Sequence, residues 1–157
     1  MFILNFKLKP SKKLMCLLGA MSVVASIVCI MCMVSVHNQV YDTATCDELG
    51  TYSLNAESVQ AQCSFLEQFS LEVLPETVQT ESITIPMEFN DTYNQYNELQ
   101  RQIGLDLSRY KGREAKEITY ELKSSEIKYA VLLVYENRVI GAHLTNGEYG
   151  QSNLPLI

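Results

Sequence analysis

The longest apolar run in the chain is residues 14–36, LMCLLGAMSVVASIVCIMCMVSV. It carries no charge, and a helix of about 20 apolar residues can cross the roughly 30 Å hydrocarbon core of a bilayer. Lys7, Lys9, Lys12 and Lys13 precede this run, whereas all eighteen Asp and Glu residues follow it. The run therefore predicts a transmembrane helix that carries one globular domain.

The lysines beside the run predict its orientation. Basic residues next to a span hold that flank in the cytoplasm, so residues 1–13 are expected inside the cell. The outer part then holds eight Lys and Arg against eighteen Asp and Glu, a net charge of −10 with both histidines neutral. Such a domain should repel nucleic acid and anionic lipid headgroups. We expect a single-pass protein of the cell membrane with its C-terminal domain outside.

Two alternatives to a retained anchor stay open. One is a secreted form of the same domain after signal cleavage, and the other is a buried core helix. A signal peptide has an apolar region of about 7–15 residues that ends at a small-x-small site. The run here is longer, and Val34-Ser35-Val36-His37 has bulky valines at both key positions. A signal-anchor that stays in the membrane is therefore favoured.

Residues 37–53 are polar and show no sustained period of 2 or 3.6, which predicts a linker. Cys46 and Cys63 are the two cysteines outside the predicted span, and a disulfide between them would close a loop of about 17 residues, worth roughly 3 kcal/mol. Two unpaired thiols, with Cys63 on a buried helix face, are the alternative. Cys16, Cys29 and Cys32 lie within the span and are expected to act as small apolar side chains.

Two amphipathic helices are predicted in the following domain. Asn55 can cap a helix over residues 56–69, whose apolar side chains recur at helical spacing. A second helix over residues 88–103 follows Pro86, and Gly104 is placed to end it in a left-handed conformation. Short strands or extended arms are predicted between these helices, around residues 71–73 and 83–85.

The remainder of the domain predicts an antiparallel sheet. Residues 117–123 alternate between apolar and polar, whereas residues 129–135, YAVLLVY, are nearly all apolar, as expected of a central strand covered on both faces. Glu136-Asn137 predicts a two-residue hairpin turn into a third strand over residues 138–144. The predicted fold class is α+β: residues 54–144 form two helices packed on one face of a meander of about three strands plus short extra strands. Residues 145–157 are expected to form a partly ordered tail.

No residue pattern predicts a catalytic site, a cofactor or a metal ion. Cys63 and His143 are the one candidate thiol–imidazole pair of the outer domain, and nothing in the sequence places them together. A core cysteine and a strand histidine are the favoured interpretation. The chain lacks Gly-x-Ser-x-Gly, Gly-x-x-x-x-Gly-Lys and dinucleotide-binding patterns, and its acids are scattered. We therefore do not expect an enzyme.

A candidate binding surface lies on the second predicted helix. Its tyrosines could line an aromatic groove for a peptide or glycan, and polar residues beside them could add contacts. The surface comprises Tyr93, Tyr96, Asn97, Gln100 and Arg101. Core tyrosines with hydroxyls at the surface, beside an ordinary solvated helix face, explain the same spacing and are favoured over a groove.

The segments Ile85–Leu122 and Ala130–Ala142 resemble a known family, the domain of unknown function numbered 4830 (DUF4830). This family occurs in small N-terminally anchored proteins of Gram-positive bacteria. The similarity covers about residues 59–142. It is carried by the Tyr-Asn-x-Leu-Gln stretch at residues 96–100, Gly104, Asp106-Leu107, Tyr110-Lys111-Gly112 and the strand at residues 132–135.

The chain departs from the family pattern at two places. Ser70-Leu71 stand where the pattern has Gly-Trp, and residues 143–147 replace a Gly-rich ending. The resemblance implies a protein of the Gram-positive cell envelope, and it supplies no catalytic residues. Together with the predicted anchor, it favours a non-catalytic binding or accessory module whose partner is an envelope protein, a peptide or a glycan. An envelope hydrolase with an unrecognised site is the alternative.

Overall fold

The structure is a computed structural model that describes residues 21–31, 40–123, 126–148 and 152–157. The chain divides into two units, residues 1–39 and residues 40–157. In the first unit, residues 21–31 are helical and their large apolar side chains are 51–65% exposed. Among the described residues, no helix is both long and apolar enough to span a membrane. Residues 14–20 and 32–36 of the predicted span lie outside the described residues.

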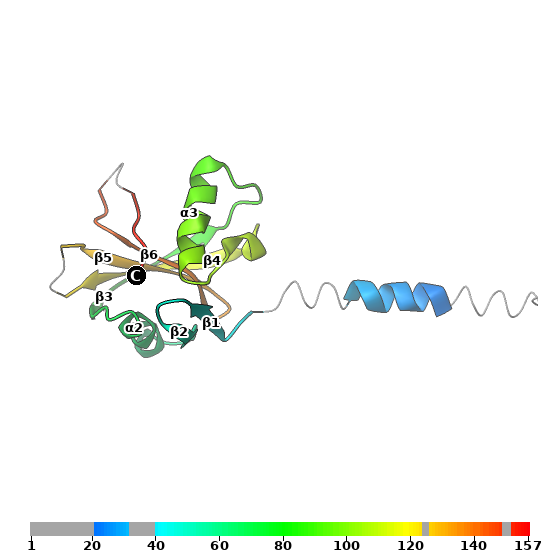
Figure 1. Cartoon of the computed structure of the whole chain (residues 1–157), viewed down its shortest axis with the longest axis horizontal. Helices are drawn as coiled ribbons and strands as arrows, with labels where there is room; N and C mark the ends of the chain where they lie inside the picture. Colours follow the sequence, from blue (N-terminus) through cyan, green and yellow to red (C-terminus); the bar gives the residue numbers. More distant parts are fainter. Residues whose placement is uncertain (1–20, 32–39, 124–125, 149–151) are drawn as a thin grey trace, which may run out of the picture. The chain divides into compact units, whose positions relative to one another are not determined.

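The second unit is built on one four-stranded antiparallel sheet (Figure 1). Its strands follow one another in chain order: β3 (Val73–Thr84), β4 (Glu114–Leu122), β5 (Tyr129–Tyr135) and β6 (Arg138–Thr145). Glu136 and Asn137 have φ angles of 47° and 62°, as a two-residue hairpin turn requires. The predicted meander is therefore confirmed.

Strand β3 differs from the prediction. The sequence predicted two short arms, but Val73 to Thr84 form one strand of 12 residues. Its pairing with β4 shifts register between Leu74 and Gln79. This bulge accommodates Pro75, which has no N–H to donate to a ladder. The polar patch that suggested an interruption is an exposed edge strand.

Three short helical elements surround the sheet. α2 (Val59–Glu67) begins at Ser58, whose side chain accepts a hydrogen bond from the Ala61 amide, and not at Asn55 as predicted. α3 (Asp91–Gln102) begins at Asn90, and η1 (Leu107–Tyr110) is a single 3₁₀ turn. Gly104 ends the α3 segment with a φ of 78°, as predicted.

The two α-helices lie on opposite faces of the sheet, so their predicted placement on one face is wrong (Figure 1). Leu132 and Val134 of β5 belong to the core cluster that includes α2, whereas Leu133 packs in the cluster beneath α3. The cause is visible in β5 itself. A strand that is apolar on both faces has to be covered on both.

The predicted linker at residues 37–53 is also wrong over most of its length. Residues from Thr43 onward form a hairpin of two strands, β1 (Thr43–Cys46) and β2 (Gly50–Ser53). Tyr52 is buried in the core, and its hydroxyl donates to the Ile103 carbonyl at the end of α3. Short polar strands lack a long apolar alternation, so their period could not be read from the sequence.

The described part of the predicted tail packs on the sheet in one place. Leu144 and Leu154 exchange backbone hydrogen bonds of 2.9 Å in each direction. Leu156 is only 6% exposed and joins the α2-side core.

Candidate functional site

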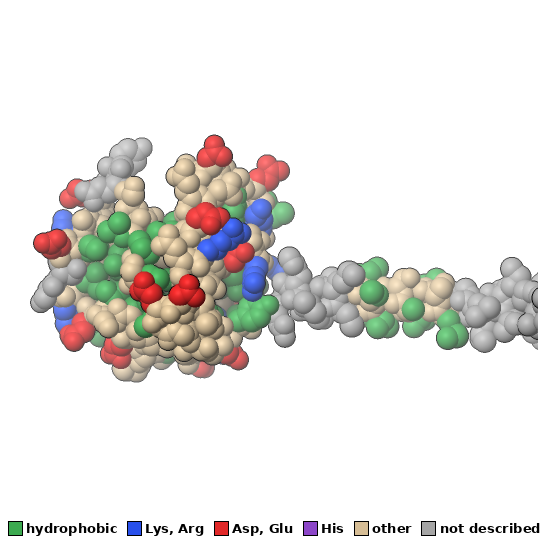
Figure 2. Space-filling view, in the orientation of Figure 1, with side chains coloured by type: hydrophobic (Ala, Val, Ile, Leu, Met, Phe, Trp, Pro, Cys, Tyr) green, Lys and Arg blue, Asp and Glu red, His purple; other side chains and the backbone are tan. Residues whose placement is uncertain are grey.

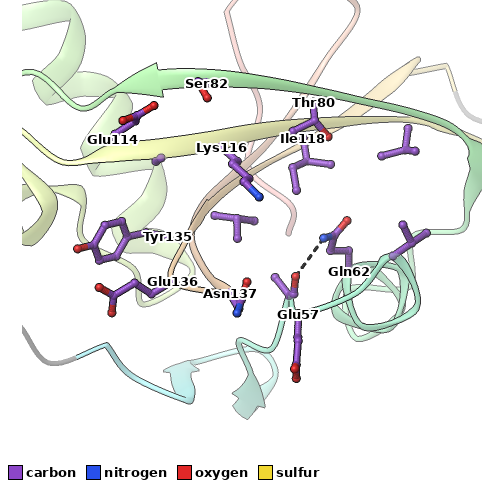
Figure 3. A pocket seen from close by; sticks show the side chains of 15 residues that line it. Glu57, Gln62, Thr80, Ser82, Glu114, Lys116, Ile118, Tyr135, Glu136 and Asn137 are labelled. Carbon is purple, nitrogen blue, oxygen red and sulfur yellow. Dashed lines mark hydrogen bonds between the residues drawn. The ribbon is translucent and has the colours of Figure 1, made fainter.

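A groove of about 580 Å³ lies between α2 and the sheet, and we call it the α2 groove (Figure 3). It exists because α2 has only nine residues and covers only part of the sheet face on its side. The groove is lined by the start of α2, by β3 and β4, and by the β5–β6 turn. It is a candidate binding site in the part of the chain that the structure describes.

The floor of the α2 groove is formed by cross-strand rows of the sheet. Thr80 lies opposite Ile118, and Ser82 lies opposite Lys116, which in turn pairs with Val134. The Ile118 and Val134 side chains are buried, so they supply an apolar base. Thr80 and Ser82 are exposed hydroxyls on the outer strand of the sheet. The floor is therefore apolar in its centre and polar towards β3.

Charged side chains surround this floor. Glu57, Glu114 and Glu136 line the groove, and Lys116 extends into it from β4 (Figure 3). No carboxylate of the described residues lies within ion-pair distance of Lys116. The groove thus offers both an ammonium group and carboxylates to a ligand above an apolar base.

The start of α2 is held in place by buried polar contacts. Gln62 donates through Nε2 to the Ala56 carbonyl over 3.0 Å, as the dashed line in Figure 3 shows. Its Oε1 accepts from the Tyr120 hydroxyl of β4. Burial, followed by the nearby Cys63, raises the pKa of Tyr120 to about 12, so this hydroxyl stays a donor. These bonds position one wall of the groove rigidly against the sheet.

The outer wall of the groove is an edge strand. β3 pairs with β4 on one side, and no second strand among the described residues pairs with its other side. An edge strand presents a row of unpaired N–H and C=O groups to which a further strand can bind. The bulge, Pro75 and the charges of Glu76 and Glu81 limit uncontrolled pairing along it.

The predicted binding surface on α3 is mostly internal. Asn97 is 3% exposed and Gln100 is fully buried. Asn97 donates to Asp106 over 2.9 Å and accepts from the Leu107 amide over 2.7 Å, so it fixes η1. Gln100 accepts from the Ala142 amide over 2.6 Å, where β6 bulges, and its Nε2 has no partner. The Asn97 and Gln100 side chains both stabilise the fold from inside. The interpretation that they belong to an ordinary solvated helix face is therefore wrong.

The aromatic residues of this surface form a ladder that ends on β6. Phe89, Tyr93 and Tyr96 stack in succession at centroid distances of 4.6 and 5.7 Å. The Tyr96 hydroxyl lies 2.9 Å from His143 Nδ1. Burial lowers the pKa of His143 to about 4 and raises the pKa of Tyr96. Both side chains are therefore neutral at pH 7, and Tyr93 and Tyr96 are partly buried.

Arg101 is the one member of the predicted surface that is exposed. Its guanidinium lies 2.6 Å from Glu98 and 3.5 Å from Asp106. Burial by itself raises the pKa of Asp106, but hydrogen bonds from Asn97 and Ser108, together with Arg101, lower it to about 2. The five predicted residues are therefore brought together, but chiefly as the internal support of α3.

Cys63 and His143 are not brought together. Cys63 packs in the cluster on the α2 side of the sheet, whereas His143 contacts Tyr96 of α3 on the other side. Cys63 also lines a shallow depression of about 650 Å³ between α2 and β3. Burial, followed by the charge of Glu67, raises its pKa, which disfavours the thiolate. Cys46 and Cys63 are both buried in this cluster as free thiols, the second alternative that the sequence left open.

The residues of the α2 groove were missed by the sequence reasoning. Thr80 and Ser82 lie in a polar stretch without a recognisable motif, and Lys116 is the third residue of a strand with ordinary alternation. The sequence offered no signal for the groove, because the first helix was predicted over residues 56–69 and the nine-residue length of α2 is known only from the structure. Within the described residues, no group of three or more His, Cys, Asp or Glu could hold a metal ion.

The larger unit is a small α+β domain with helices on both faces of an antiparallel sheet. A family model described as a domain of unknown function (DUF4830) matches residues 63–144, and the chain belongs to this family. The match runs from α2 to the end of β6 and confirms the resemblance found in the sequence. No curated protein and no solved structure matches the chain.

Proposed function

We propose that this chain is a membrane-anchored binding module of the Gram-positive cell envelope, with residues 1–13 in the cytoplasm and residues 40–157 outside. The uncharged run of residues 14–36 behind four lysines supports the anchor and its orientation. Within this run, residues 21–31 are helical and expose their large apolar side chains, as a lipid-facing helix would. The envelope assignment follows what the resemblance in the sequence implies, because the matching family model is itself described only as a domain of unknown function.

The α2 groove is the proposed ligand site, and an extended peptide of an envelope protein is the proposed ligand. The observation that carries this proposal is the position of the groove beside an edge strand. A peptide can add to β3 through backbone hydrogen bonds, and its alternate side chains then point towards the groove floor. The apolar base suits the stem of such a side chain, and the ring of charges suits a polar end.

The proposed module is non-catalytic. Its one candidate thiol–imidazole pair is divided between two faces of the sheet, and burial disfavours the reactive form of Cys63. The described residues that line the α2 groove include neither cysteine nor histidine. Binding of a peptide needs neither, because main-chain hydrogen bonds supply affinity and the groove supplies selectivity.

The peptide site is tested by filling the groove. Thr80→Trp places a large side chain in it, whereas Gln79→Trp places the same side chain on the opposite face of the same strand. The full chain in lipid nanodiscs is used to select peptides of about ten residues from a random library, a length that spans an edge strand. We expect Thr80→Trp to weaken the selected peptides at least about tenfold, and Gln79→Trp to leave their affinity unchanged.

Equal binding to both variants, or no peptide enriched over empty nanodiscs, would contradict the peptide site. The anchor is tested separately in whole cells. A protease added to intact cells should digest residues 40–157, and the N-terminus of the mature chain should be intact. Protection of the domain until the cells are lysed would contradict the orientation, and a new N-terminus near residue 37 would indicate a cleaved signal.

A further inference from the structure

One segment of the domain is basic, although the domain as a whole is acidic. Residues 107–113, LSRYKGR, hold three basic residues and no acid. Arg109 and Lys111 make no ion pair with a carboxylate of the described residues. In Figure 2, the Lys and Arg side chains on this side of the domain lie among Asp and Glu side chains. The segment at residues 107–113 is therefore a cluster of basic residues in an acidic domain.

The end of the domain that holds this segment exposes apolar and aromatic side chains. Met87 is 71% exposed, the highest value among large apolar side chains of the described residues, and Tyr41 is 43% exposed. Arg109 lies 5.0 Å from the centre of the Tyr41 ring, and Lys111 lies 4.5 Å from the centre of the Phe89 ring. Backbone bonds between Ile85 and the turn at residues 112–113 place the Met87 loop beside these cations. We call Tyr41, Met87, Arg109 and Lys111 the tether end.

Two acidic side chains near the tether end are paired with arginines. Asp42 pairs with Arg138 over 2.6 Å, and Asp106 lies 3.5 Å from Arg101. Arg109 and Lys111 are exposed cations at this end, and the exposed carboxylate of Glu88 beside Met87 offsets part of their charge. Cations above exposed apolar side chains are the combination that binds the interface of an anionic bilayer.

The length of the chain limits the distance from this end to the membrane. The hairpin begins at Thr43, and Tyr41 already contacts Arg109. Only four peptide steps separate Val36, the last residue of the predicted span, from Val40. Four extended residues reach at most about 14 Å, and the headgroup layer on each side of a bilayer is itself roughly 6 Å thick.

We propose that the tether end rests on the headgroups of an anionic bilayer, with Arg109 and Lys111 against the lipid phosphates and Met87 at the interface. This inference rests on the proposed anchor. The remaining surface of the domain is strongly acidic and is repelled by the same lipids, so the membrane holds the domain in one orientation. An attached domain with uniform charge would instead rotate freely about its tether.

The test uses the absence of tryptophan from the chain. Met87→Trp introduces a single fluorophore at the tether end. Glu72→Trp introduces one next to β3 at the other end of the sheet, where the Glu72 side chain is 76% exposed. Strand β4 connects the two ends and is about 26 Å long. Each full-length variant is reconstituted into vesicles that contain brominated lipids, which quench only nearby tryptophan.

We expect strong quenching of the Met87→Trp fluorophore in anionic vesicles, and quenching at least about twofold weaker in zwitterionic vesicles because the lipid charge supplies the attraction. Adding Arg109→Glu and Lys111→Glu should lower the ratio of docked to undocked domain about tenfold. Glu72→Trp should show little quenching in either lipid. Equal quenching at both positions, or quenching of Met87→Trp that ignores the charge reversal, would overturn the proposal.

Failure of the anchor is distinguished from failure of the docking by alkaline extraction of the same vesicles. A chain that is extracted into the supernatant lacks the proposed anchor. A chain that stays in the membrane while Met87→Trp remains unquenched has the anchor but does not dock.

Discussion

The two faces of the sheet are built differently, although each is covered by one amphipathic helix. The α2 face is held by apolar packing, in which the rings of Tyr52, Phe65 and Phe69 lie 5.1–6.1 Å apart. The α3 face combines an apolar cluster around Leu133 with the buried amides of Asn97 and Gln100, which bond to backbone groups. The α2 face leaves the α2 groove open beside its helix. On the α3 face, Asn97 and Gln100 were predicted as part of a binding surface, but they form hydrogen bonds inside the domain.

This contrast teaches where a ligand site can arise in so small a domain. Asn97 bonds through both its nitrogen and its oxygen inside the fold, and Gln100 is fully buried, so neither amide can reach a ligand. An apolar helix needs only to cover enough of the sheet to exclude water from its own stripe. The uncovered remainder is the α2 groove.

The largest expected effect breaks the apolar face. Phe65 is 1% exposed, and Phe65→Ala should lower the free energy of unfolding by about 4 kcal/mol because it leaves a cavity in the core. Phe89→Ala is the matched change on the α3 side, where the ring is half-buried, and should cost about half as much or less. Urea unfolding of the full chain in detergent micelles, followed by circular dichroism, compares them. Equal losses would show that the two faces are packed alike.

The second effect is a pH dependence that belongs to the α3 face. The folded-state pKa of His143 is about 4, below the ordinary value of 6.5, because the ring is buried. The unfolded chain therefore binds more protons between pH 6.5 and 4, and stability falls as pH decreases through this window. The protonation of His143 should lower the free energy of unfolding by about 3 kcal/mol at pH 4, and it should have no effect above pH 6.5.

His143→Phe isolates this contribution, because it removes the titrating ring. Glu117 has a pKa raised by burial and by Glu81, so its own contribution has the opposite sign and is present in both proteins. The difference in unfolding free energy between wild type and His143→Phe, measured from pH 7 to pH 4, is the informative quantity. A difference that does not change with pH would show that His143 titrates normally in the folded state.

The smallest effect concerns how the two helices end. The α3 segment ends at Gly104, where an added Cβ would lie 2.2 Å from the Thr45 carbonyl oxygen. Ser70 follows α2 with a φ of 59°, a conformation that favours glycine. Ser70→Gly should therefore raise the free energy of unfolding by about 1 kcal/mol. Ser64→Gly, inside α2, should lower it by a similar amount, and thermal unfolding would reveal a wrong sign in either variant.

Much of the fold could be predicted because its signals are local. The apolar run at residues 129–135, the Glu136–Asn137 turn and the position of Gly104 each follow from a few neighbouring residues. The β1–β2 hairpin and the length of β3 could not be predicted in this way. The residues of these segments are mostly polar and show no long alternation. The hairpin is held by Tyr52, which bonds to the Ile103 carbonyl, and β3 is held by its pairing with β4.

The sequence alone determined the charge asymmetry of the chain, its predicted anchor, the strand order of the meander and its family, because each follows from composition or from neighbouring residues. Only the tertiary structure decided which face each helix covers, that Asn97 and Gln100 are internal, and that Thr80, Lys116 and Glu136 share one groove. The physical reason is that packing joins residues from separate elements. Burial and proximity are properties of that assembly, and no single segment carries them.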